Sequence, residues 1–140
     1  MPLIIDTSAL VASLYREAGT EAINRAFVNE ARTAFIPAPV LFEYHRVTSL
    51  KANVPNPVAL ELQARLLALG VRVLALDEAM ALCAAEMNER YGSGNERGGK
   101  LNLLDLMVYA AAKARDLPIL CTGKDFITTD AKIHPASRPE

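Results

Sequence analysis

Few residues of this sequence belong to the types that bind zinc or form disulfides. It has two cysteines, two histidines and no tryptophan. Cys83 and Cys121 form no CxxC pair, and neither has a histidine at metal-ligand spacing. We therefore expect both thiols to be reduced core residues. We expect His45 and His134 to be ordinary surface residues rather than metal ligands.

Long apolar runs are also missing. The longest ones, such as residues 106–112, fall far short of the roughly 20 residues that a transmembrane helix needs. Only a short apolar run precedes Asp6, and it is too short for the apolar core of a signal peptide. These absences predict a soluble, cytoplasmic protein that makes no membrane contact.

A surplus of positive charge is absent as well. The formal net charge is -1, so the chain as a whole does not attract a polyanion. Any contact with nucleic acid must come from a local basic patch or from a bound metal. The 140 residues, 51% of them hydrophobic, are enough to bury one core and too few for two ordinary domains. We expect a single domain over residues 1–140.

Apolar patterning predicts an alternation of strands and helices. Strands are expected at 2–5, 34–36, 71–76 and 118–121, and helices at 7–15, 20–31, 39–50, 57–69, 78–91 and 103–115. In the helix at 57–69 we expect Leu60, Ala64, Leu67 and Ala68 to face inward. The alternation is typical of an α/β fold with a mainly parallel sheet and helices on both faces.

Four acidic residues stand where this fold would bring side chains together. Asp6 and Asp125 follow the first and last strands, and Glu43 and Asp105 lie near the starts of helices. Ligands of open parallel sheets bind beyond the carboxyl ends of the strands, so these acids can converge there. Clustered carboxylates repel one another unless a cation offsets the charge. Oxygen-only ligands favour Mg²⁺ or Mn²⁺ over Zn²⁺.

For two of these acids, a helix cap or a turn is a simpler explanation of their position. Asp6 can cap the helix that follows it, about as readily as it can serve in a site. Ser8 can provide that cap instead, which would leave Asp6 free. Asp125 can simply start a turn at Phe126.

The other two acids have a simpler explanation within their own helices. Glu43 can pair with Arg46 three residues later on a helix surface. Asn102 and Asp105 have the spacing of a capping box, in which each side chain binds the other's backbone N–H. Against this, Asp105 stands in an otherwise apolar stretch, where an unpaired carboxylate is costly to bury.

The ordered set of motifs resembles a known family. The matching segments are residues 4–10, Glu43 within a helix, residues 101–105 leading into 109–113, and residues 118–126. Together they span nearly the whole chain and resemble the PIN-domain ribonucleases, and within them the VapC-type toxins of bacterial toxin-antitoxin pairs. The order of the four acids carries the resemblance, with Asn102 before the third and Gly123 and Phe126 around the fourth. Leu104 and Leu106 depart from the pattern, because related toxins often have a glycine and a small residue there.

The resemblance implies a metal-dependent endoribonuclease with a Rossmann-like, three-layer α/β/α fold. It implies that the acids are catalytic and hold Mg²⁺ or Mn²⁺, with the metal lowering the pKa of a bound water. The implied metal-binding and catalytic residues are Asp6, Glu43, Asp105 and Asp125, and the supporting ones are Thr7, Ser8 and Asn102. It also implies an inhibitory antitoxin protein as partner, and we expect the chain to form a homodimer.

Basic residues near the acids are candidates for holding RNA. We expect Arg46 and Lys124 to bind it, with Lys51, Arg97 and Lys100 as further candidates. The apolar residues Leu10, Leu14 and Phe27 of the early helices can serve a protein partner, or they can be ordinary core.

Two other functions fit parts of this pattern. The first is a catalytically inactive, PIN-like protein-binding module, against which the presence of all four acids counts. The second is a phosphotransfer domain that uses Asp6 as a nucleophile. Ser8 occupies the position where this chemistry would place a second aspartate, which counts against a phosphotransfer domain.

Overall fold

The computed structural model describes residues 1–137. Within them, four strands form one parallel sheet in the order β3-β2-β1-β4. The strands are β1 (Leu3–Ile5), β2 (Ala34–Pro37), β3 (Arg72–Leu74) and β4 (Ile119–Leu120). The α-helices are α1 (Thr7–Leu14), α2 (Glu21–Asn29), α3 (Ala38–Thr48), α4 (Pro57–Leu69), α5 (Glu78–Tyr91) and α6 (Leu103–Arg115). Three short 3-10 helices are η1 (Ala31–Thr33), η2 (Lys51–Asn53) and η3 (Phe126–Thr128). The predicted parallel α/β fold is confirmed.

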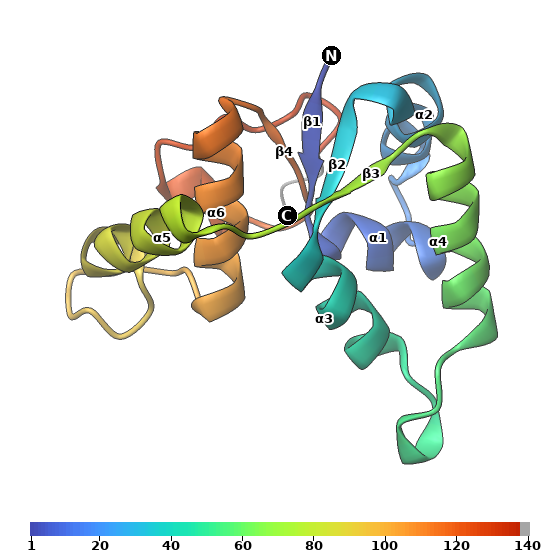
Figure 1. The fold of residues 1–140 in the computed structure, drawn as a ribbon, viewed down its shortest axis with the longest axis horizontal. Helices are drawn as coiled ribbons and strands as arrows, with labels where there is room; N and C mark the ends of the chain where they lie inside the picture. The colour runs from blue at the N-terminus through green and yellow to red at the C-terminus, as the bar shows by residue number, and fades with distance from the viewer. Residues whose placement is uncertain (138–140) are drawn as a thin grey trace.

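The helices cover both faces of the sheet. Helices α5 and α6 lie on one side and α1, α2 and α4 on the other, which gives three layers (Figure 1). Helix α3 follows the carboxyl end of β2 and contacts both α1 and α6. This places α3 at the edge of the sheet where parallel sheets bind ligands.

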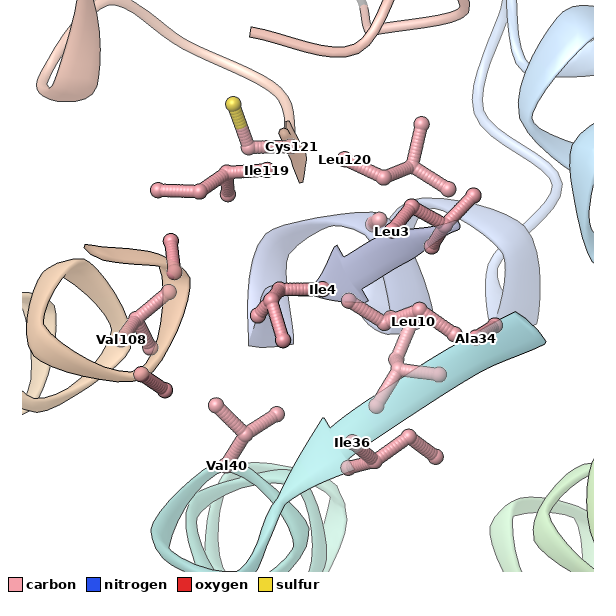
Figure 2. Packing of buried hydrophobic residues seen from close by; sticks show 14 of the residues in the cluster. Leu3, Ile4, Leu10, Ala34, Ile36, Val40, Val108, Ile119, Leu120 and Cys121 are labelled. Atoms are coloured by element: carbon pink, nitrogen blue, oxygen red, sulfur yellow. The ribbon is translucent and has the colours of Figure 1, made fainter. Parts of the chain in front are cut away.

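Strand β1 is central and fully buried. Ile4 is paired with β2 on one side and β4 on the other, and its exposed fraction is 0%. Figure 2 shows the Ile4 side chain near Val108 of α6 and Val40 of α3. Because both faces of β1 pack against helices, its apolar residues fix where the chain emerges from the sheet. The residue that emerges is Asp6.

The predicted inward face of α4 is wrong. The structure buries Ala59 and Leu66 instead, while Leu60 and Leu67 remain 45% and 39% exposed. Ala64 and Ala68 are also exposed. Helix α4 is rich in apolar residues around most of its surface, so its sequence pattern does not select a face. The contacts with α1, α2 and η1 select it.

The segment after η3 packs along β4. The backbone N–H of His134 donates a hydrogen bond to the Ile119 carbonyl, and Ile133 forms a parallel bridge with Ile119. This segment buries the side chain of His134, which is only 6% exposed and contacts Glu30 at 3.0 Å. The prediction that His134 is a surface residue is therefore wrong.

The structure also tests the predicted helix bounds, the apolar residues of the early helices and the cysteines. Helices α5 and α6 have the predicted bounds, and α3 ends at Thr48, two residues before the expected end. Leu10 and Phe27 are core residues, with exposed fractions of 1% and 3%. Both cysteines are free thiols, as predicted, although Cys83 is only partly buried. No helix of residues 1–137 is both long enough and apolar enough to cross a membrane.

Candidate active site

Asp6 is the N-cap of α1. Its Oδ2 accepts hydrogen bonds from the Ser8 backbone N–H at 3.2 Å and from the Ser8 hydroxyl at 2.6 Å. The capping interpretation is thus correct, and the expectation that Ser8 would cap the helix and leave Asp6 free is wrong. Both bonds converge on one oxygen of Asp6, so the same carboxylate can cap the helix and serve in a site.

The carboxyl group of Asp6 is unusual in its burial. Its exposed fraction is 8%, and this burial raises the pKa of Asp6 above its ordinary value. Hydrogen bonds from Ser8 lower that pKa, and the nearby charge of Glu43 raises it again. The charge of a second carboxylate, 37 positions later on α3, therefore acts on Asp6.

Ser8 connects the first and last strands at this edge. Its hydroxyl donates to Asp6 and accepts a hydrogen bond from the Thr122 backbone N–H at 3.0 Å. Beside it, the Thr7 hydroxyl is buried and has no hydrogen-bond partner within the described residues. The start of α1 thus holds Asp6 in place and leaves one buried polar group unused.

Asp105 and Asn102 form the capping box that the sequence predicted. Asn102 Oδ1 accepts from the Asp105 N–H at 2.8 Å, and Asp105 Oδ2 accepts from the Asn102 N–H at 3.1 Å. This arrangement fixes Asp105 in the first turn of α6. As with Asp6, the capping role and a place in the site are compatible.

Asp105 experiences the charge of all three other acids. Burial raises its pKa, the hydrogen bond from the Asn102 N–H lowers it, and Asp6, Asp125 and Glu43 raise it further, so that it reaches about 6. Because charges act in this way only at short range, the four carboxylates lie near one another. The structure therefore brings together acids from four separate segments of the chain.

Glu43 reaches the cluster from the second turn of α3. Its side chain is half-buried, and within residues 1–137 it forms no salt bridge with Arg46. The alternative of a surface ion pair is therefore wrong. The charge of Glu43 acts on Asp6 and Asp105 instead.

Asp125 is the most exposed of the four acids. It precedes η3, where its backbone carbonyl accepts a hydrogen bond from the Thr128 hydroxyl at 2.8 Å. The expected turn at Phe126 is therefore present. The backbone of Asp125 makes this turn, and its carboxylate provides no side-chain cap. The carboxylate is available at the rim of the cluster.

Cys121 directly follows β4 and is close enough to the acids for their charges to act on it, although it was not among the predicted site residues. Burial raises the pKa of its thiol to about 12, and the charges of Asp6, Asp125 and Asp105 add to that rise. A thiol with such a pKa stays protonated and is a poor nucleophile. Its place directly after β4 is the signal that could have located it, because that is where the strand ends converge.

The donor set suits a hard divalent cation. All four candidate ligands are carboxylates, and the buried Thr7 hydroxyl is a further oxygen at the same edge. In residues 1–137, no three acidic, histidine or cysteine side chains are grouped closely enough to coordinate one ion directly. Mg²⁺ usually keeps several waters and binds to proteins through only one or two carboxylates. The residues therefore fit Mg²⁺, or the similar Mn²⁺, held partly through water.

The basic candidates differ in their surroundings. Arg46 and Lys124 are exposed and form no salt bridge within the described residues, whereas Arg97 lies 3.7 Å from Glu89 on α5. Lys51 and Lys100 are exposed as well. Only Arg97 already has an acidic partner.

A groove of about 610 Å³ lies elsewhere, between α1, α2 and α4. None of the four acids lines it. Leu14 is partly buried and lines this groove, whereas Phe27 lies at its base and is only 3% exposed.

A comparison with protein families identifies the domain. Residues 3–132 match the family model for the PIN domain, which is most of the chain and includes all four acids. The chain belongs to the PIN-domain family.

Curated relatives place this PIN-domain protein among the VapC ribonucleases. It is 33% identical to Ribonuclease VapC42 of Mycobacterium tuberculosis over 135 residues, which cover 96% of this chain and 98% of the relative. It is also 33% identical to Ribonuclease VapC of Mycolicibacterium smegmatis over 133 residues, covering 94% and 100%. Such identity over nearly the full length of both chains shows common descent.

Solved structures agree on the fold of the PIN domain. The structure of the Mycobacterium tuberculosis toxin VapC20, which cleaves the sarcin-ricin loop, superposes with a TM-score of 0.71 at 19% identity and covers 92% of this chain and 95% of that one. A toxin-antitoxin complex from Klebsiella pneumoniae gives a TM-score of 0.66 at 17% identity, covering 95% and 97%. The predicted three-layer PIN-like architecture is confirmed.

Proposed function

We propose that this VapC ribonuclease is a metal-dependent endoribonuclease and the toxin of a type II toxin-antitoxin pair, in a single domain over residues 1–140. Asp6, Glu43, Asp105 and Asp125 are its catalytic, metal-binding residues. Mg²⁺ or Mn²⁺ is the cofactor, and RNA phosphodiester bonds are the substrate. We place it in the cytoplasm, where thiols such as its two free cysteines stay reduced.

One observation carries this proposal. Helix caps fix Asp6 and Asp105 where α1 and α6 begin, and the charges of Asp6, Glu43 and Asp125 all act on Asp105 there. Mutual repulsion of this kind destabilises a protein unless a cation or protons offset it. Capping explains why Asp6 and Asp105 stand where they do, but it does not explain why Glu43 and Asp125 share their surroundings.

Each part of the site has a distinct task in this proposal. A bound divalent cation would activate water and stabilise charge on the phosphate that is attacked. The carboxylates of Asp6 and Asp105, each fixed by a helix cap, would hold the cation in a constant place. Thr7, Ser8 and Asn102 support that placement, and Arg46 and Lys124 bind the negatively charged RNA.

An antitoxin partner is part of the same proposal. Solved relatives include a toxin-antitoxin complex from Klebsiella pneumoniae, which supports a protein inhibitor for this chain as well. We propose that the antitoxin occupies the groove between α1, α2 and α4, since the exposed side chains of Val28 and Val58 give it apolar lining. We further propose that the protein is a homodimer.

The direct test is cleavage of an end-labelled RNA with Mg²⁺ or Mn²⁺ and with a chelator. We expect cleavage by the wild-type protein with metal, and none with the chelator or in Asp6→Asn and Asp105→Asn. Asp116→Asn is the matched control, because Asp116 is an exposed acid whose left-handed backbone also suits asparagine. Folded Asp105→Asn that still cleaves would contradict the proposal. A wild-type protein that binds no metal and cleaves no RNA would support the inactive binding module instead.

A further inference from the structure

Phe42 is exposed in a way that its residue type seldom is. Its exposed fraction is 69%, whereas Phe27 and Phe126 are each 3% exposed and Phe35 packs partly against the core. Phe42 directly precedes Glu43, whose charge acts on the other acids. An aromatic ring thus stands in solvent at the position that precedes an acid of the cluster in the chain.

The geometry of α3 explains this exposure. Val40, Tyr44 and Thr48 recur at every fourth residue and form the buried face of the helix. Phe42 lies two positions from Val40, about 200° away around the helix, so it projects from the opposite face. No core contact therefore accounts for a large apolar side chain at this position.

Arg46 extends the same exposed stripe. It follows Phe42 by four residues, a spacing that places two side chains next to each other on a helix surface. Arg46 is exposed and forms no salt bridge within residues 1–137. The stripe thus combines a flat aromatic ring with an available guanidinium group.

This pair has the chemistry that single-stranded nucleic acids require. Every base has a π-face that can stack on an aromatic ring, and guanidinium groups bind phosphates. We infer that Phe42 stacks on an unpaired nucleobase of the RNA, while Arg46 holds that nucleotide's phosphate beside the cluster. The inference rests on the proposed ribonuclease function. It makes Phe42 a residue that binds substrate next to the cleaved bond.

The lack of tryptophan in this chain offers a clean optical test. F42W introduces one tryptophan at the stripe, and L82W introduces one on α5, where Leu82 is comparably exposed at 62%. Both are made in the cleavage-deficient D105N protein and titrated with a single-stranded oligoribonucleotide in Mg²⁺. We expect the RNA to quench the fluorescence of F42W and not that of L82W. Equal responses of the two reporters would overturn the inference.

Cleavage kinetics separate this inference from the proposed function. In the protein that keeps Asp105, we expect F42A to raise KM by about ten-fold and to leave kcat unchanged. A rise of this size corresponds to the loss of binding from one stacked base. F42W should restore KM, and L82A should leave it unaltered. A wild-type protein that cleaves RNA while F42A keeps the same KM would overturn the inference alone. Loss of a dimer in F42A but not L82A, measured by sedimentation, would overturn it in favour of a second copy on this face. No cleavage by the wild type would instead reject the proposed function.

Discussion

The Thr122 backbone N–H donates a 3.0 Å hydrogen bond to the hydroxyl of Ser8, which lies 114 positions earlier in the chain. The same hydroxyl donates to Asp6 at 2.6 Å. One side chain therefore joins the ends of β1 and β4 and orients a carboxylate of the candidate site. Stability and activity are coupled through Ser8.

Replacing Ser8 tests this coupling. We expect Ser8→Ala to lower the free energy of unfolding by about 1–3 kcal/mol, because it leaves the Thr122 N–H without its partner. It should also raise the pKa of Asp6, since the hydrogen bond from the Ser8 hydroxyl, which alanine cannot make, lowers that pKa. The acid limb of the pH–activity profile should then move to higher pH. Ser8→Thr keeps the hydroxyl and is the control; equal profiles for both variants would contradict this role.

The raised pKa of Asp105 predicts how stability depends on pH. The folded protein holds a proton on Asp105 up to about pH 6, whereas the unfolded chain releases it near its ordinary value of 3.8. The folded state therefore binds more protons between these values, and stability falls as pH rises through that window. We expect the metal-free protein to melt at a lower temperature at pH 7.5 than at pH 5.

Metal and substitution should each reduce this pH dependence. Mn²⁺ should raise the melting temperature more at pH 7.5 than at pH 5, because the cation offsets the ionised acids. Asp105→Asn should flatten the metal-free profile, since asparagine can still accept the Asn102 hydrogen bond without bearing a charge. A metal-free profile of the wild type that rises across this range would contradict the interpretation.

The capping box of α6 predicts a specific link between stability and activity. Asn102→Ala should cost about 1 kcal/mol and loosen the first turn that holds Asp105. Asp77→Ala is the matched control, because Asp77 caps α5 through the Met80 N–H. Similar losses of stability are expected from both, with a fall in RNA cleavage only in Asn102→Ala. A comparable fall in Asp77→Ala would show that the effect reflects stability alone.

Glu30 contributes to stability away from the site. Burial would raise its pKa, but hydrogen bonds from His134 and the N-terminal ammonium, together with their charges, lower it below 4.5. This stabilisation is therefore present above about pH 4.5 and is lost as pH falls through the lowered pKa. We expect Glu30→Gln to cost about 1–2 kcal/mol in chemical unfolding at pH 7. Cleavage per folded molecule should not change, and a loss of kcat would contradict a purely structural role.

Local signals in the sequence predicted much of the fold. The predicted bounds of α4 and α5 are correct because the signals at their ends are local: Asn56 and Asp77 cap the helix starts and Gly70 ends α4, each through bonds to residues a few positions away. The Asn102–Asp105 capping box is of the same kind. The alternation of strands and helices likewise needed only the apolar pattern.

Features that depend on distant parts of the chain could not be predicted from local sequence. The burial of His134 requires the last described segment to pack along β4, and the inward face of α4 depends on which helices cover it. The interpretation of Glu43 as a partner of Arg46 used a neighbour in sequence, whereas its charge acts on Asp6 and Asp105. The four candidate acids of the site could be identified from the sequence, but only the fold brings them near one another.

The central claim is that these four carboxylates together hold a catalytic divalent cation. A crystal structure of the wild-type protein soaked with Mn²⁺, with the ion located by its anomalous scattering, tests it most directly. We predict one ion beyond the carboxyl ends of β1 and β4, with oxygens of Asp6 and Asp105 within about 2.0–2.6 Å or joined to it through water. Glu43 and Asp125 should complete its surroundings. An ion bound elsewhere, or none at a saturating Mn²⁺ concentration, would contradict the account.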